Sequence, residues 1–328
     1  MIPRDGMQDF LARHGWGEAV VRPLAGDASF RRYFRVEDRG RRAVLMDAPP
    51  AQEDVRPFLH VADVLLGAGF SAPRLIAGDL NVGFLLIEDF GDRLMGPVLV
   101  TEPELEDPVY GQAVDLLVEL HRMPPPLELK PYGRQELVRE VQIFADWYAK
   151  AAGIEADAEG YIAAWDAVWA TVLAETDRGP VLTLRDYHAE NLMLLPDRPG
   201  AQALGLLDFQ DALAGHRAYD LVSLLQDARR DVSPRLERAM IERFVRHGEV
   251  DDAADFRASY EVLGAQRNVK ILGIFVRLRD RDGRAGYVER LPRVWGYLQR
   301  NMAHPALAPL KAWFDAHVPE DKRSRWCA

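Results

Sequence analysis

The chain has 328 residues, of which 41 are Lys or Arg and 51 are Asp or Glu, so its formal net charge at pH 7 is −10. An acidic chain has no general attraction for nucleic acid or an anionic membrane surface, and we expect neither as a partner. Hydrophobic residues make up 48% of the chain, which excludes disorder throughout. The one cysteine, Cys327, excludes an intrachain disulfide and a cysteine-ligated metal centre.

The N-terminal residues indicate a protein of the cytoplasm. They contain no basic segment followed by an apolar one, as a secretory signal would require. A transmembrane helix needs about 18 uncharged apolar residues in a row, and we expect none in this chain. These features leave the oligomeric state undetermined.

The first 90 residues predict a small β-rich lobe. Short apolar segments separated by Gly, Asp and Pro read as strands, and two segments with apolar residues at helical spacing read as helices. The helices are expected over 7–17 and from about residue 54 to 66, and the strands over 20–24, 33–36, 43–46, 75–77 and 84–87.

The rest of the chain predicts a larger, mostly helical lobe, with a hinge near residues 88–91. One β-hairpin, over 191–195 and 203–207, interrupts the helices. The fold class is therefore α+β, with an N-lobe over residues 1–90 and a C-lobe over 91–328. Helices are expected over 109–120, 135–152, 157–174, 218–227, 234–247, 251–279 and 285–301.

Three polar residues follow apolar strands in the most informative part of the sequence. Asp186 ends one strand, Asn191 opens the next, and Asp208 ends the strand after that. Phosphoryl transfer needs an acceptor for a hydroxyl proton and oxygen ligands for Mg²⁺. The spacing therefore predicts that Asp186 is the base and that Asn191 and Asp208 hold the metal.

This pattern resembles the aminoglycoside and choline phosphotransferase family, within the protein-kinase-like superfamily. The resemblance rests on D-x-x-x-x-N from Asp186 to Asn191, the later Asp208-Phe209-Gln210, His188 after Asp186, and Tyr219-Asp220-Leu221. It covers nearly the whole chain and implies a two-lobed kinase-like fold that uses ATP and Mg²⁺. Asp220 is expected to support the catalytic loop through backbone hydrogen bonds.

A finer resemblance concerns one subgroup of that family. Its characterised members are anomeric kinases for N-acetylmuramate and N-acetylglucosamine in cell-wall recycling, which make the sugar 1-phosphate from ATP. The subgroup implies a small-molecule sugar as substrate. The segments that carry the resemblance are 26–34, 46–50, 208–212 and 266–275.

The nucleotide-binding residues are expected in the first lobe. Backbone N–H groups of Gly26, Ala28 and Ser29 would hold phosphate, and the backbone near Glu88 and Phe90 would hold adenine. Where kinases carry Lys on the third strand this chain has Met46, and the helix that would supply its Glu partner has Phe58 and Leu59 there. Arg31 or Arg32 is the candidate replacement for that Lys.

The candidates for contact with the acceptor lie in the second lobe. Gln266, Arg267 and Lys270 share a helix face by spacing, and the subgroup resemblance favours a substrate role as much as a surface one. In the loop after Asp186, His188 and Glu190 are further candidates. His188 fits a structural role in that loop better than a metal-binding role.

Two alternatives stay open. The chain can be a kinase of an aminoglycoside, choline or another small alcohol, and an acidic acceptor site would favour those cationic substrates. Alternatively, it can be a nucleotide-binding pseudokinase or regulatory module. The missing Lys–Glu pair favours a pseudokinase, whereas the intact set of Asp186, Asn191 and Asp208 argues against it.

Overall fold

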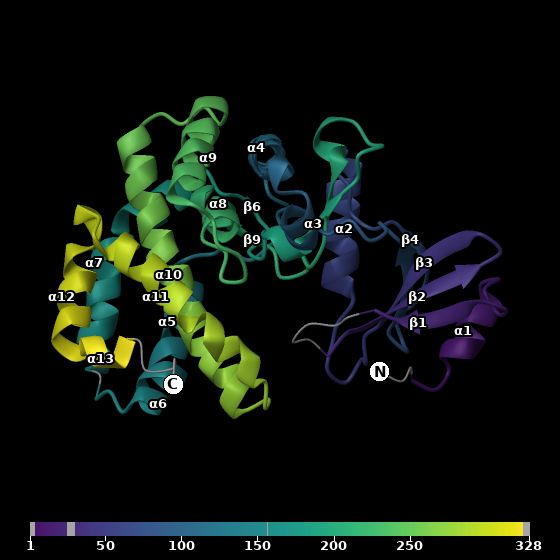
Figure 1. Cartoon of the computed structure of the whole chain (residues 1–328), viewed down its shortest axis with the longest axis horizontal. Helices are drawn as coiled ribbons and strands as arrows, with labels where there is room; N and C mark the ends of the chain where they lie inside the picture. Colours follow the sequence, from purple (N-terminus) through teal and green to yellow (C-terminus); the bar gives the residue numbers. More distant parts are fainter. Residues whose placement is uncertain (1–3, 25–29, 156, 324–328) are drawn as a thin grey trace. The chain divides into compact units, whose positions relative to one another are not determined.

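The computed structural model describes residues 4–24, 30–155 and 157–323, and the chain divides into two units (Figure 1). The N-terminal unit comprises Met1–Val98 together with Asn191–Asp211, and the helical unit comprises Leu99–Glu190 together with Ala212–Ala328. The first boundary thus lies somewhat beyond residue 90. The segment 191–211 groups with the N-terminal unit although it lies between helices in the sequence.

A five-stranded antiparallel sheet in the order β1-β2-β3-β5-β4 is the framework of the N-terminal unit. Alternate residues of its strands, such as Phe34 and Val36, are buried on one face, where α1 (Met7–Arg13) packs through Phe10. Strands β1 to β5 cover Val20–Pro23, Arg32–Asp38, Arg41–Asp47, Leu75–Asp79 and Phe84–Glu88.

The hairpin of β7 (Leu192–Leu194) and β8 (Leu204–Leu206) completes the N-terminal unit, with α2 (Arg56–Gly67). Isolated bridges join this hairpin to Ser71 and Leu94, which explains why it groups with this unit. At Gly205 of β8, a Cβ atom would lie 2.7 Å from the ring of Phe90, so only glycine allows this close approach.

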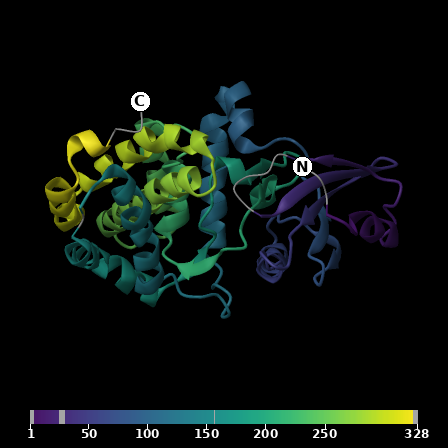
Figure 2. The ribbon, with the colours of Figure 1, turned by 90° about the horizontal axis from the view of Figure 1, so that it is seen from below.

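The helical unit surrounds its longest helix, α10 (Ala253–Asp280), with shorter ones (Figures 1 and 2). At Gly273 of α10, a Cβ atom would lie 2.4 Å from the carbonyl oxygen of Ile143, so the missing side chain permits this contact. The other helices are α4 (Glu106–Leu120), α5 (Arg134–Ile143), α6 (Lys150–Ala152), α7 (Ala158–Arg178), α8 (Ala218–Leu225), α9 (Pro234–His247), α11 (Leu291–Met302), α12 (Ala308–His317) and α13 (Glu320–Arg323), while α3 (Met95–Thr101) spans the boundary between the units.

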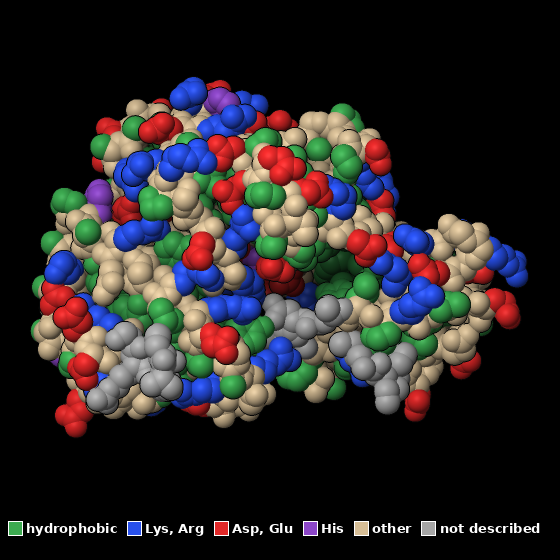
Figure 3. All heavy atoms as spheres, viewed as in Figure 1, with side chains coloured by type: hydrophobic (Ala, Val, Ile, Leu, Met, Phe, Trp, Pro, Cys, Tyr) green, Lys and Arg blue, Asp and Glu red, His purple; other side chains and the backbone are tan. Residues whose placement is uncertain are grey.

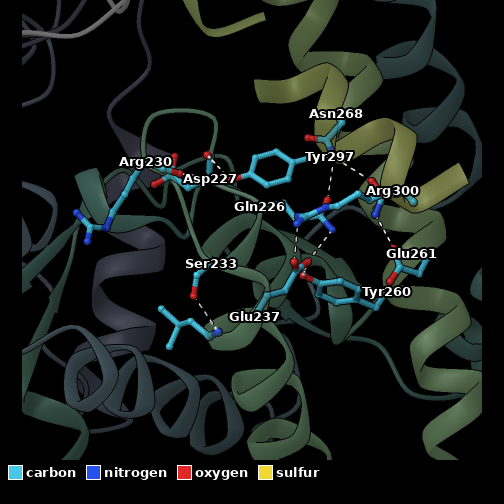
Figure 4. A network of polar contacts seen from close by, with 12 residues as sticks. Gln226, Asp227, Arg230, Ser233, Glu237, Tyr260, Glu261, Asn268, Tyr297 and Arg300 are labelled. Atoms are coloured by element: carbon cyan, nitrogen blue, oxygen red, sulfur yellow. Dashed lines mark hydrogen bonds and ion pairs between the residues drawn. The ribbon is translucent and has the colours of Figure 1, made fainter. Parts of the chain in front are cut away.

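A buried polar network links four of these helices (Figure 4). Glu237 of α9 accepts hydrogen bonds from Gln226, which follows α8, at 3.1 Å and from the Tyr260 hydroxyl of α10 at 2.8 Å. The Gln226 side-chain oxygen in turn accepts from Asn268 of α10 at 2.8 Å, and Arg300 of α11 pairs with Glu237 at 3.0 Å. Because each of these side chains forms at least one hydrogen bond or ion pair, polar groups are accommodated inside this unit.

The predicted α+β class, with a small β-rich part and a larger helical one, is confirmed, and the differences concern short or interrupted elements. Strand β9 (Leu213–Gly215) was not predicted because it has only three residues and pairs with the distant β6 (Val181–Thr183). The helix expected over 135–152 contains a π-helical turn, Phe144–Ala149. The helix expected over 285–301 begins at Leu291, after the 3₁₀ turn Ala285–Arg290.

Acidic and basic side chains are mixed on the face of the protein seen in Figure 3, where they lie side by side over each unit. The net charge of −10 therefore does not form one acidic face there. Among the helices of the described residues, none is long and apolar enough to cross a membrane.

His121, directly after α4, is a histidine whose ring nitrogens are buried without a hydrogen-bond partner among the described residues. Burial, and then the nearby Arg217 and His216, lower its pKa to about 3, below the usual value near 6.5. Between these two pH values the unfolded chain binds more protons than the folded protein. The folded protein is therefore destabilised as the pH falls through this range.

The substitution His121→Phe tests this effect, because it keeps an aromatic ring beside Phe244 and removes the titrating group. Between pH 7 and pH 5, the free energy of unfolding of the wild type should fall by about 2 kcal/mol more than that of the variant. Chemical denaturation at the two pH values measures the difference. The same pH dependence in both proteins would contradict the prediction.

Candidate active site

The loop that carries Asp186 follows β6 in the helical unit and is held by Asp220 of α8. The buried Asp220 carboxylate accepts hydrogen bonds from the backbone N–H groups of Leu184 at 2.6 Å and Arg185 at 2.8 Å. Arg185 has a φ of 71°, a left-handed conformation that a non-glycine residue rarely adopts. Asp220 thus makes the kind of contact expected of a residue that supports this loop.

Asp186 keeps its negative charge although it lies in a mostly buried loop. Burial favours the neutral carboxyl, but Lys270, then His188, Arg267 and Arg185 act in the opposite direction, and the net effect lowers the pKa of Asp186. A carboxylate that stays ionised at neutral pH is able to accept a proton. The neighbouring Asp220 differs, because burial raises its pKa to about 7.

Glu140 of α5 is the centre of a buried ionic network beside this loop. Its carboxylate pairs with Arg185, accepts from the Tyr132 hydroxyl and from Gln266 Nε2 at 2.8 Å, and lies 3.2 Å from Lys270 Nζ. Burial alone would raise the pKa of Glu140, but Lys270 and Arg185 lower it to about 2. Two elements far apart in sequence, α5 and α10, are thereby joined to the Asp186 loop.

Gln266 and Lys270 therefore use their side chains within the protein. Lys270 also donates to the Tyr219 hydroxyl at 2.8 Å, so both residues hold the network together. Arg267, between them in the sequence, is buried as well but is not among the residues described above that contact Glu140. A contact of Gln266, Arg267 or Lys270 with the acceptor remains a prediction.

His188 is buried in the same loop and neutral. Arg229 Nη1 lies 3.1 Å from its Nε2, and because arginine only donates, this nitrogen accepts. Burial, and then Arg229, lower the pKa of His188 to about 4. The contact suits a structural role, whereas Glu190 is exposed at the end of the loop. Their contact with the acceptor remains a prediction.

The two predicted metal ligands lie at the hairpin in the N-terminal unit. The backbone N–H of Leu207, next to Asp208, donates to the carbonyl oxygen of Asn191 at 3.0 Å, which ties the two ligand positions together. Asp208 has a φ of 55°, and its side chain is 44% exposed and able to meet a ligand. One carboxylate and one amide oxygen fit Mg²⁺, which prefers oxygen ligands and keeps several waters.

The structure distinguishes between the two arginines proposed for phosphate. Arg32 lies directly opposite Asp47 in the β2–β3 pair and binds its carboxylate at 2.6 Å. Arg31 Nη2 lies 3.5 Å from Asp208 Oδ1, and Arg31 Nε lies 3.6 Å from Glu53 Oε2. Arg31 is thus the arginine beside the predicted metal ligand. The phosphate-loop candidates Gly26, Ala28 and Ser29 lie outside the described residues.

Apolar side chains occupy the places of the usual Lys–Glu pair. Met46 on β3 is fully buried. Phe58 of α2 stacks on Phe209, the residue after Asp208, with ring centroids 5.1 Å apart. Helix α2 therefore contacts the Asp208 loop through aromatic packing, and Glu53, just before this helix, supplies the acid that meets Arg31.

The predicted adenine segment is held by an arginine that the sequence reasoning missed. Arg198, in the β7–β8 loop, pairs with Glu88, donates to Ser71 Oγ at 2.8 Å, and places its guanidinium 5.1 Å from the Phe90 ring centre. The side chains of Glu88 and Phe90 are therefore directed to the hairpin. The groups of this segment that would bind adenine are therefore those of its backbone, and this contact remains a prediction. No local motif marks Arg198, since its partners lie about 110 residues away or more.

Comparison with known proteins identifies the class of protein that this fold and these loops form. Residues 20–256 match the model of the phosphotransferase enzyme family, and the chain belongs to this family. Relatives in Caulobacter vibrioides and Pseudomonas aeruginosa are both named N-acetylmuramate/N-acetylglucosamine kinase. The first is 38% identical, over 96% of this chain and 96% of the relative, and the second 37% identical, over 93% and 91%.

Solved structures agree on the fold. A putative aminoglycoside phosphotransferase from Ralstonia eutropha superposes with a TM-score of 0.60 at 16% identity, covering 95% of this chain and 98% of that one. A choline/ethanolamine kinase family protein from Mesorhizobium loti gives 0.59 at 14% identity, covering 94% and 99%. The predicted kinase-like fold and the prediction of a phosphotransferase are thus confirmed.

The Glu140 network should make a large contribution to stability. Glu140→Gln removes the carboxylate that Arg185 and Lys270 share, and leaving buried charges uncompensated costs about 3–5 kcal/mol. The control is Glu136→Gln on the same helix, whose pair with Arg139 is at the surface and contributes at most about 1 kcal/mol. Chemical denaturation followed by tryptophan fluorescence measures both, and equal effects of the two variants would contradict this account.

Proposed function

We propose that this protein is an ATP-dependent kinase that phosphorylates the anomeric hydroxyl of N-acetylmuramate and N-acetylglucosamine, giving the sugar 1-phosphate. The observation that carries the proposal is the similarity over nearly the whole chain to two kinases named for these sugars. The lowered pKa of Asp186 supports the proposal, because it leaves the carboxylate ionised and able to accept a proton. The reaction would belong to amino-sugar metabolism in cell-wall recycling and take place in the cytoplasm.

The predicted base, metal ligands and phosphate loop receive roles in this reaction. ATP would supply the γ-phosphoryl group, and bound Mg²⁺ would neutralise charge on its phosphates. Asn191 and Asp208 would hold the metal, and the backbone of Gly26, Ala28 and Ser29 would contact phosphate. Asp186 would orient the sugar hydroxyl and accept its proton. A hemiacetal hydroxyl is more acidic than an ordinary alcohol, so an ionised carboxylate suffices as the base.

The charges around Asp186 favour a neutral or acidic acceptor. Lys270, Arg267 and Arg185 all lower the pKa of Asp186, so the base lies in a region of positive potential. A cationic aminoglycoside or choline would be repelled there, whereas the carboxylate of N-acetylmuramate would be attracted. This observation favours the sugar kinase over the kinase of a cationic alcohol.

Arg31 supports an active kinase over a pseudokinase. The pseudokinase alternative depends on the missing Lys–Glu pair. Arg31 and Glu53 provide a cation and a carboxylate, the same two kinds of group as the Lys–Glu pair, from other positions of the chain. Arg31 also lies beside Asp208. The proposal therefore assigns Arg31 to the nucleotide phosphates.

A coupled assay of ADP release over N-acetylmuramate, N-acetylglucosamine, kanamycin and choline tests the proposed function. We expect turnover with the two sugars, and phosphorus NMR should identify a sugar 1-phosphate. Asp186→Asn should lower kcat by about 10²–10⁴-fold, because the base is lost. Turnover with kanamycin or choline alone would establish the alternative kinase, and absence of turnover with all four together with ATP binding would establish a pseudokinase.

Arg31→Met should raise the KM for ATP by about tenfold or more, since hydrogen bonds to charged groups contribute about 1.5–3 kcal/mol. The neighbouring Arg32→Met is the matched control, because Arg32 is already bound to Asp47. Arg32→Met should leave the KM for ATP within about threefold of the wild type. The assignment of Arg31 fails if its variant binds ATP as the wild type does.

A further inference from the structure

Arg267 differs from Lys270 on the same helix, because two nitrogens of its guanidinium form no hydrogen bond among the described residues. It is only 4% exposed, and its Nε and Nη1 are buried with no hydrogen-bond partner among the described residues. By contrast, Gln266 and Lys270 are bound to Glu140. A guanidinium carries five N–H donors, and burying its charge without an acceptor is unfavourable. The arrangement therefore suits an anionic group that arrives with a ligand.

The surroundings of Arg267 place that ligand at the Asp186 loop. The charge of Arg267 acts on Asp186, His188 and Asp220, all of which belong to this loop or support it. The Asp220 carboxylate is already engaged by two backbone N–H groups of the loop. Asp186 has the proposed task of accepting a proton from the sugar. An acceptor sugar beside Asp186 would therefore lie next to a guanidinium with donors available.

The local balance of charge also suits an acid. Arg185 and Lys270 share the single carboxylate of Glu140, which leaves one positive charge in that group. Arg267 adds a second positive charge, whereas Asp186 and the buried Asp220, whose pKa is about 7, contribute negative charge. The cations still outweigh the other groups in their effect on Asp186, since its pKa is lowered despite its burial. A sugar carrying a carboxylate would be attracted to these cations.

We propose that Arg267 binds the lactyl carboxylate of N-acetylmuramate and thereby determines that the enzyme accepts this acidic sugar. The inference rests on the proposed function and adds the residue that recognises the acid. The planar fork of a guanidinium matches the two oxygens of a carboxylate. N-acetylglucosamine lacks the lactyl group, so it makes no use of this contact and serves as a matched substrate.

The test compares kcat/KM for the two sugars in the wild type, Arg267→Met and Arg267→Lys. In Arg267→Met we expect a loss of about ten- to hundredfold with N-acetylmuramate, and a change within about threefold with N-acetylglucosamine. Arg267→Lys should recover part of the activity on the acidic sugar. Activity of Arg267→Met on N-acetylglucosamine shows that the variant is folded.

The control is Arg277→Met, ten residues further along α10 and about 15 Å away. It should leave both sugars unaffected. Equal losses on the two sugars in Arg267→Met would overturn the inference and indicate that Arg267 acts through Asp186 or on the phosphates. No loss on either sugar would also overturn it. A wild type inactive on both sugars would instead overturn the proposed function itself.

Discussion

The buried carboxylate of Glu140 is the interaction on which the chemistry of the helical unit depends. It lies on α5 and compensates Arg185 in the loop of the proposed base and Lys270 on α10. Without it, two cations would lie in a region that water barely reaches, at a large electrostatic cost. Glu140 thereby connects the loop to α10, whereas the ionisation of Asp186 follows from the cations around it. The strained backbone of Arg185, with φ at 71°, persists because the same network and Asp220 hold it.

In the N-terminal unit, apolar side chains occupy the positions at which kinases carry the Lys–Glu pair. They are Met46 on β3 and Phe58, which packs against Phe209. The cation and the acid are instead Arg31 and Glu53, and Arg31 also lies beside Asp208. The Arg31 side chain is only 11% exposed, and the two nearby carboxylates compensate its charge. The phosphate-binding cation of our proposal is therefore compatible with an apolar third strand.

The net charge of the chain gives a misleading impression of its proposed site. The value of −10 is a sum over the whole chain, and acidic and basic side chains are mixed on the face seen in Figure 3, while the neighbourhood of Asp186 contains Lys270, Arg267 and Arg185. Electrostatic potential at a partly buried point depends on the nearest charges, because water and salt screen the distant ones. The choice between a cationic and an acidic acceptor thus depends on a few side chains of α5, α10 and the loop.

The sequence by itself determined the α+β class, the order of the main elements and the three residues proposed for base and metal. These depend on local properties: periodicity defines strands and helices, and the spacing of Asp186, Asn191 and Asp208 follows one loop and one hairpin. Only the tertiary structure decided which arginine lies beside Asp208, because the β2–β3 register places Arg32 opposite Asp47. It also revealed β9, Arg198 and the Glu140 network. Apart from the contact of Tyr132 with Glu140, their partners lie tens of residues away or more, and no local pattern records which distant residues folding brings together.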